Sequence, residues 1–163
     1  MSTELAYTCA TELVRRYRAK QLSPVEVTQA VLARTRELNP TLNAYCLVDE
    51  EGALKTARAA EARWAKGEPL GALDGVPASI KDLILARGWP TLRGSKTVDR
   101  AGPWLEDGPA TARLRESGAV LLGKTCTPEF GWKGVTDSAL TGITRNPWNT
   151  ARTPGGSSGG ASA

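Results

Sequence analysis

The sequence of 163 residues contains no histidine. Within these residues this absence excludes the Ser-His-Asp and Cys-His arrangements of nucleophilic catalysis, because both use an imidazole as the base. The cysteines are few, widely spaced and without a CxxC pair: Cys9, Cys46 and Cys126. They argue against a disulfide framework and a zinc knuckle, and are typical of a reducing compartment. We expect neither a metal ion nor an organic cofactor.

Long hydrophobic runs and blocks of like charge are missing as well. No apolar run approaches the roughly 20 residues of a membrane-spanning helix, and the start of the chain has no basic and apolar signal region. Lysine and arginine number 21 against 17 aspartate and glutamate, a net charge of +4 that is scattered along the chain. A basic arm for nucleic acid is not visible. We therefore expect a cytoplasmic protein that binds neither membranes nor nucleic acid, and leave a homodimer open.

The first 70 residues have the pattern of helices. Ser23-Pro24-Val25-Glu26 predicts a helix start, because serine caps, proline suits the first position and glutamate completes a capping box. Asn39-Pro40 predicts the end of that helix, and Gly67 predicts the end of the next one. The expected elements are helices over about residues 10–17, 23–39 and 50–66, and a short strand over residues 44–48.

From Gly71 onward, glycines and prolines separate short apolar runs, which predicts strands joined by structured loops. Between Lys124 and Pro154 we expect no regular element, and the small residues 159–163 are typical of the start of a helix. The alternation indicates an α/β fold class: a helical N-terminal region followed by part of a mixed or mostly parallel sheet flanked by helices. The expected elements are a buried strand over residues 76–85, a helix over residues 107–117 and a strand over residues 119–122.

Lys81 lies in the middle of the expected strand 76–85, bracketed by Ile80 and Leu83. A charged lysine is costly to bury there. One interpretation is that its amine reaches the surface or pairs with Asp82. The other is that burial lowers its pKa and makes it a general base. The lysine by itself leaves both open.

The segment Gly-Gly-Ser-Ser-Gly-Gly at residues 155–160 allows backbone conformations that a Cβ would forbid. It is compatible with a flexible linker, with a nest of amides for an anion, or with a turn that presents Ser157 for chemistry. A serine hydroxyl needs a base to act, and without histidine the candidate base is Lys81.

Residues 118–125 satisfy the P-loop pattern G-x-x-x-x-G-K-[ST]. The middle residues, Ala-Val-Leu-Leu, favour a buried strand rather than a loop around phosphates, and a helix is expected before them. The segment therefore argues against a nucleotide site. Cys126 is expected to be a buried thiol, since no histidine can activate it.

Taken together, the motifs resemble the amidase signature family, and the resemblance covers nearly the whole chain. These motifs, in this order, are highly specific. They are Leu-Asp-Gly-Val-Pro at residues 73–77, Ile-Lys-Asp at 80–82, the segment 118–130, Thr-Arg-Asn-Pro-Trp at 144–148, and Arg-Thr-Pro-Gly-Gly-Ser-Ser-Gly-Gly at 152–160.

The resemblance implies an amidase, which hydrolyses a carboxamide C–N bond with a Ser-Ser-Lys triad through an acyl-enzyme. Lys81 matches the family's general base, and Ser157 matches the bridging serine, which in the family follows a cis peptide bond. The family's nucleophilic serine and oxyanion hole lie beyond Ala163. Residues 1–163 are thus expected to be the N-terminal part of a single amidase domain, with a helical region over 1–70 and an α/β part over 71–163.

On this interpretation the chain is inactive alone, and its partners are a small-molecule amide and the missing C-terminal part of the same protein. An alternative within the family is the glutaminase subunit of a tRNA-dependent amidotransferase. The segment Thr-Pro-Glu-Phe-Gly-Trp at residues 127–132 is more similar to stand-alone amidases than to that subunit. A third hypothesis is a naturally short, non-catalytic binding protein.

Overall fold

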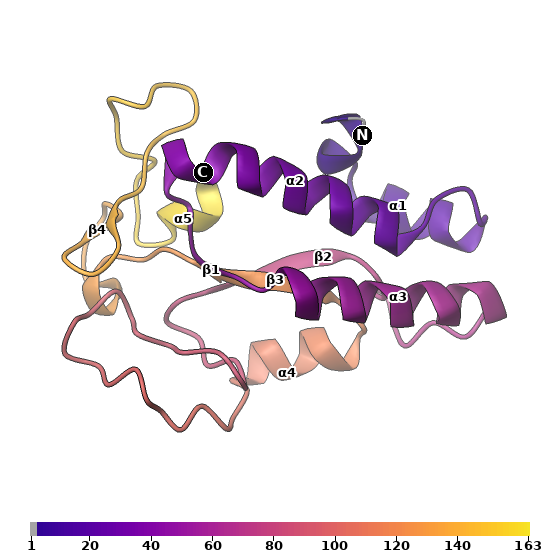
Figure 1. The fold of residues 1–163 in the computed structure, drawn as a ribbon. Helices are drawn as coiled ribbons and strands as arrows, with labels where there is room; N and C mark the ends of the chain where they lie inside the picture. Colours follow the sequence, from indigo (N-terminus) through magenta and orange to yellow (C-terminus); the bar gives the residue numbers. More distant parts are fainter. Residues whose placement is uncertain (1–2) are drawn as a thin grey trace. The chain divides into compact units, whose positions relative to one another are not determined.

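The computed structural model describes residues 3–163. The chain divides into two compact units that interleave along the sequence. Unit 1 consists of the chain up to Glu37 together with Asp49–Ala78 and Ala112–Leu122, and unit 2 consists of Leu38–Val48, Ser79–Thr111 and Gly123–Ala163. The elements (Figure 1) are η1 (Thr3–Tyr7), α1 (Ala10–Arg18), α2 (Pro24–Leu42), β1 (Tyr45–Val48), α3 (Glu50–Lys66), β2 (Pro77–Lys81), α4 (Pro109–Glu116), β3 (Val120–Thr125), η2 (Glu129–Gly131), β4 (Asp137–Ser138), β5 (Gly142–Ile143) and α5 (Gly159–Ser162).

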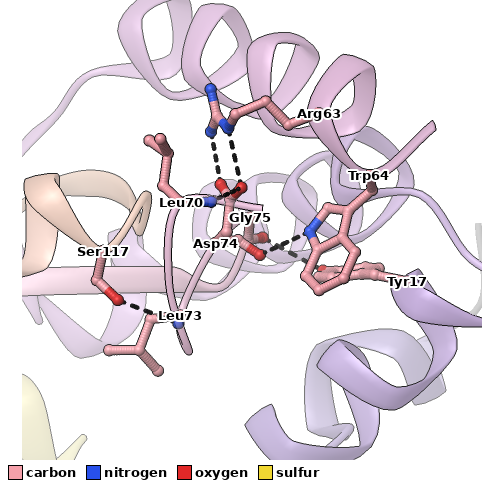
Figure 2. A network of polar contacts seen from close by, with 8 residues as sticks. All are labelled: Tyr17, Arg63, Trp64, Leu70, Leu73, Asp74, Gly75 and Ser117. Carbon is pink, nitrogen blue, oxygen red and sulfur yellow. Dashed lines mark hydrogen bonds and ion pairs between the residues drawn. The ribbon is translucent and has the colours of Figure 1, made fainter. Parts of the chain in front are cut away.

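The core of unit 1 forms around two aromatic side chains. The rings of Tyr17 and Trp64 lie with their centroids 6.1 Å apart. The Trp64 indole N–H donates to the Asp74 carbonyl at 3.0 Å, and the Tyr17 hydroxyl donates to the Gly75 carbonyl at 3.3 Å (Figure 2). Both rings thus place a polar atom on the segment that leads into β2. The buried residues of this cluster are Leu13, Tyr17, Val27, Trp64 and Val76.

An ion pair between Arg63 and the buried Asp74 carboxylate also holds this segment. The Asp74 side chain is fully buried, and Arg63 at the end of α3 donates to it through Nε at 2.9 Å and through a second nitrogen (Figure 2). The Leu70 backbone N–H also donates to this carboxylate, at 3.0 Å. These three donors satisfy a buried carboxylate. The chain therefore enters β2 from a position held by side chains of α1 and α3.

Capping explains where α2 begins and where α3 begins and ends. At the start of α2, Glu26 accepts from the Ser23 backbone N–H at 2.9 Å, as the expected capping box requires, while Ser23 Oγ accepts from the Val25 N–H. At α3, Asp49 accepts from the Gly52 N–H, and Gly67 ends the helix with a left-handed φ of 79°. The bounds predicted for α3 are confirmed.

The predicted end of α2 is wrong. The helix continues through Pro40 to Leu42, and its last turn closes with a hydrogen bond from the Asn43 N–H to the Asn39 carbonyl at 2.8 Å. The side chain of Asn39 then accepts from the next two backbone N–H groups, which direct the chain into β1. Proline removes one helical N–H donor and crowds the preceding turn, but these local hydrogen bonds to Asn39 beyond Pro40 accompany the continued helix.

Three strands form a sheet in the order β1-β3-β2 (Figure 1). β1 is antiparallel to β3, with a register shift at Cys46. β2 runs parallel to β3, because Val76 accepts from Val120 at one end and Asp82 donates to Thr125 at the other. The sheet is therefore mixed, and the α/β class predicted from sequence is confirmed. All residues of β3 are buried, as expected for a central strand.

Strand bounds differ from those predicted. The strand expected over residues 76–85 ends at Lys81, because the Ile84 N–H donates to the Lys81 carbonyl at 2.9 Å and closes a turn. The strand expected over residues 119–122 extends to Thr125. The helix expected over residues 107–117 is shorter at its start, beginning at Pro109.

The prediction of no regular element between Lys124 and Pro154 is also wrong, because a single turn (η2) and the β4–β5 hairpin lie there. Both are too short to produce a hydrophobic period in the sequence. The helix start predicted at residues 159–163 is confirmed by α5. Among residues 3–163, no helix combines the length and the apolar character needed to cross a membrane.

Candidate active site

Lys81 is the last residue of β2 and is half-buried, whereas its neighbour Ile80 is buried. Side chains alternate between the two faces of a strand, so Lys81 points away from the face that buries Ile80 and Asp82. The backbone around it is held on both sides: the Asp82 N–H donates to the Thr125 carbonyl at 3.0 Å, and the Lys81 carbonyl accepts from Ile84. The lysine thus stands at a fixed strand end rather than in the strand middle.

The Gly-Gly-Ser-Ser-Gly-Gly segment is an ordered loop and not a linker. Thr136 Oγ1 donates to the Gly155 carbonyl and accepts from the Gly159 N–H, both at 2.9 Å, so one hydroxyl holds both ends of the segment. A Cβ at Gly156 would lie 2.6 Å from the Val135 carbonyl oxygen, which only glycine permits. The peptide bond between Gly156 and Ser157 is cis, as the family resemblance implies.

The structure brings together both site residues predicted from the sequence. Lys81 Nζ lies 2.7 Å from Ser157 Oγ. It also lies 2.9 Å from Ser158 Oγ, a contact that sequence reasoning missed. The serine doublet itself is the signal that could have indicated it. One amine therefore contacts two adjacent hydroxyls from a loop 76 and 77 residues further along the chain.

Burial lowers the pKa of Lys81 below its ordinary value, because desolvation penalises the ammonium form. The two serine hydroxyls that contact the amine are neutral, so they hold it in place without the attraction of an opposite charge. An amine in this state can accept a proton from a hydroxyl at hydrogen-bond distance. The arrangement can therefore activate a serine without an imidazole.

The segment with the P-loop pattern does not form a phosphate loop. Its middle residues belong to β3, and the Lys124 side chain is fully buried and donates to the Ile84 carbonyl at 2.8 Å. Cys126 is buried, as expected. Over residues 3–163, no cluster of three or more histidine, cysteine, aspartate or glutamate side chains could hold a metal ion.

Comparison with known proteins agrees with this geometry. The amidase family model matches residues 26–163. The chain belongs to the amidase family. It is 43% identical over 163 residues to a glutamyl-tRNA(Gln) amidotransferase subunit from Acidothermus cellulolyticus, covering 99% of this chain and 32% of that protein. It is 46% identical over 153 residues to the subunit of the same name from an Azoarcus species, covering 93% and 31%.

Solved structures of amidases have the same fold over this length. A bacterial aryl acylamidase of the amidase signature family is 36% identical with a TM-score of 0.85, covering 97% of this chain and 33% of that one. The peptide amidase of Stenotrophomonas maltophilia is 33% identical with a TM-score of 0.87, covering 98% and 34%. The chain thus spans about one third of the length of the relatives that it matches.

Proposed function

We propose that the protein is an amidase that hydrolyses the C–N bond of a small-molecule carboxamide, with Lys81 as general base and Ser157 as proton relay. The observation that supports this most directly is the 2.7 Å contact between the Lys81 amine and the Ser157 hydroxyl. The lowered pKa of Lys81 supports it further, because an amine accepts a proton only in its neutral form.

In the proposed reaction, Lys81 accepts the proton of Ser157 while Ser157 takes the proton of a nucleophilic serine. That serine attacks the carbonyl carbon, the C–N bond breaks, and the leaving nitrogen receives the proton returned through Ser157. Water, deprotonated along the same path, then attacks the ester and releases the carboxylic acid and the serine. Each proton that Lys81 accepts is given back within the cycle.

We assign the nucleophilic serine and the oxyanion donors to sequence outside residues 1–163, within a single amidase domain of which these residues are the N-terminal part. The relatives are about three times as long as this chain, which leaves room for both. The 163-residue chain alone then lacks a nucleophile and is inactive. Loss of an oxyanion donor alone would reduce the rate by about 10²–10³-fold.

A second candidate is a glutaminase subunit that supplies ammonia to a partner. It is favoured by the sequence similarity to two glutamyl-tRNA(Gln) amidotransferase subunits, which are 43% and 46% identical to this chain. The proposed Lys81–Ser157 chemistry is the same in both cases. Ammonia release from glutamine that appears only when partner subunits are added would favour the second candidate.

The test is ammonia release from a panel of carboxamides by the complete protein. We expect Lys81→Ala and Ser157→Ala each to lower kcat/KM by at least about 10²-fold, the usual contribution of a general base. Lys133→Ala is the matched control, because Lys133 is an exposed lysine that pairs with Asp137 on the surface. Activity that survives Lys81→Ala, or hydrolysis by the 163-residue chain alone, contradicts the proposal.

A further inference from the structure

The central strand β3 carries a second lysine, Lys124, which the proposed reaction does not use. Its side chain is fully buried, and its Nζ donates to the Ile84 carbonyl at 2.8 Å and to Thr91 Oγ1 at 2.7 Å. The third neighbour is Asp82 Oδ1 at 3.4 Å. An ammonium group has three N–H donors, and each has a partner here. Burial of a charge is costly unless such partners compensate for the lost water.

The partners of Lys124 all belong to the turn that follows Lys81 or to the loop beside it. Ile84 closes the turn by donating to the Lys81 carbonyl. Asp82 is the residue next to Lys81 and is itself buried. Its other oxygen accepts from the Gly94 N–H at 3.3 Å. The ammonium and the carboxylate therefore tie the turn to β3 on one side and to the loop at residue 94 on the other.

The pair acts on Lys81 only through the backbone. The Lys81 amine contacts Ser157 and Ser158, whereas Asp82 and Lys124 contact each other. Burial raises the pKa of Asp82 and lowers the pKa of Lys124, because desolvation penalises both charges. Removing one partner would leave the other charge buried without compensation.

We propose that Lys124 and Asp82 are positioning residues: they hold the end of β2 so that the Lys81 amine stays buried against Ser157. This inference rests on the proposed function, because it assumes that Lys81 is the base. The titration of Lys81 tests it without a measurement of activity. A ligand-binding role for the pair is not supported. Asp82 and Lys124 do line a cavity of about 320 Å³, yet the N–H donors of Lys124 are used within the protein.

The test is the titration of Lys81 in the complete protein, followed by NMR of the labelled lysine side chains. Lys124→Met removes the charge and the bonds to Ile84 and Thr91. If that variant fails to fold, the double variant Asp82→Asn/Lys124→Met leaves no unpaired buried charge and keeps an acceptor for the Gly94 N–H. Lys133→Met is the matched control, since Lys133 forms a half-exposed pair with Asp137 in the same unit.

We expect the Lys81 titration to move upward toward the ordinary value of a lysine in the double variant, and to stay unchanged in the control. The reason is that a loosened strand end lets water reach the amine. In the complete protein the same variant should lower kcat by about 10²-fold with a smaller change in KM, since about 1 Å of misplacement has that effect. The rising limb of the pH–rate profile should shift to higher pH.

A merely structural pair would lower the unfolding temperature and leave the Lys81 titration where it is, and that result overturns this inference. The failure of the proposed function looks different. If Lys81 titrates like a free lysine in the unaltered chain, or if the complete protein retains activity in Lys81→Ala, then the base itself is wrong and the pair has nothing to position.

Discussion

A serine hydroxyl relays a proton only when a base stands beside it, and the group beside Ser157 that could serve as base is the Lys81 amine. The resemblance of the sequence to the amidase signature family indicated both residues, and their atoms lie 2.7 Å apart. Composition alone could not decide between a linker and a structured turn for residues 155–160. Thr136 decided it, because its hydroxyl bonds both ends of the segment.

At this scale we predict that the two serines are unequal. Ser158→Ala removes one of the two hydroxyls that contact Lys81 and leaves the Ser157 contact intact. A single hydrogen bond contributes about 1 kcal/mol, so kcat/KM for carboxamide hydrolysis by the complete protein should fall by about tenfold at most. Ser157→Ala should lower it far more. Equal losses for the two variants would show that the relay is not confined to Ser157.

Among the elements, helices of two or more turns were predictable, and the single turn η2 and the two-residue strands were not. α3 has an aspartate cap, a stripe of small buried residues and a left-handed glycine at its end, and its bounds follow from these signals. α2 passes through Pro40 because hydrogen bonds to Asn39 continue the chain beyond it. The two-residue strands of the β4–β5 hairpin are too short to show a hydrophobic period, and only their backbone pairing defines them.

Gly123 within β3 provides a prediction at the scale of elements. Its φ is +151°, and a Cβ there would lie 2.9 Å from the Leu47 carbonyl carbon and from Val48 Cα. We therefore expect Gly123→Ala to lower the free energy of unfolding by about 1–3 kcal/mol, measured by urea denaturation. Gly134→Ala is the control, because a Cβ at Gly134 would meet open space. Similar midpoints for the two variants would contradict the strained pairing of β1 with β3.

At the scale of the whole molecule, the chain passes repeatedly between its two units. β2 and β3 each begin in unit 1 and end in unit 2. The family signals therefore fall in both units, and the core residues around Tyr17 and Trp64 set the start of the strand whose end presents Lys81.

The buried Tyr17 phenol allows a prediction about the stability of the protein at high pH. Burial raises the pKa of the Tyr17 phenol, so the folded state keeps it neutral. A group with a raised folded-state pKa contributes its full stability below its unfolded pKa of about 10 and loses that contribution as the pH rises above it. We expect the urea midpoint of unfolding to decrease as the pH rises above about 10. Tyr17→Phe should make that decrease smaller.

The control for this pH series is Tyr7→Phe, because Tyr7 is 69% exposed. It should leave the alkaline loss of stability as it is in the unaltered chain. An equal flattening by both substitutions would mean that burial of Tyr17 is not the cause.

By itself, the sequence determined the family, the α/β class and the bounds of α3, and it singled out Lys81 and Ser157 as candidates, because these depend on motifs and on periods that local chemistry sets. Only the tertiary structure decided that Lys81 and Ser157 meet, how Thr136 shapes the serine loop, and that Lys124 bonds Ile84 and Thr91. These depend on contacts between residues far apart in the chain, and side-chain hydrogen bonds of that kind have no local period to read.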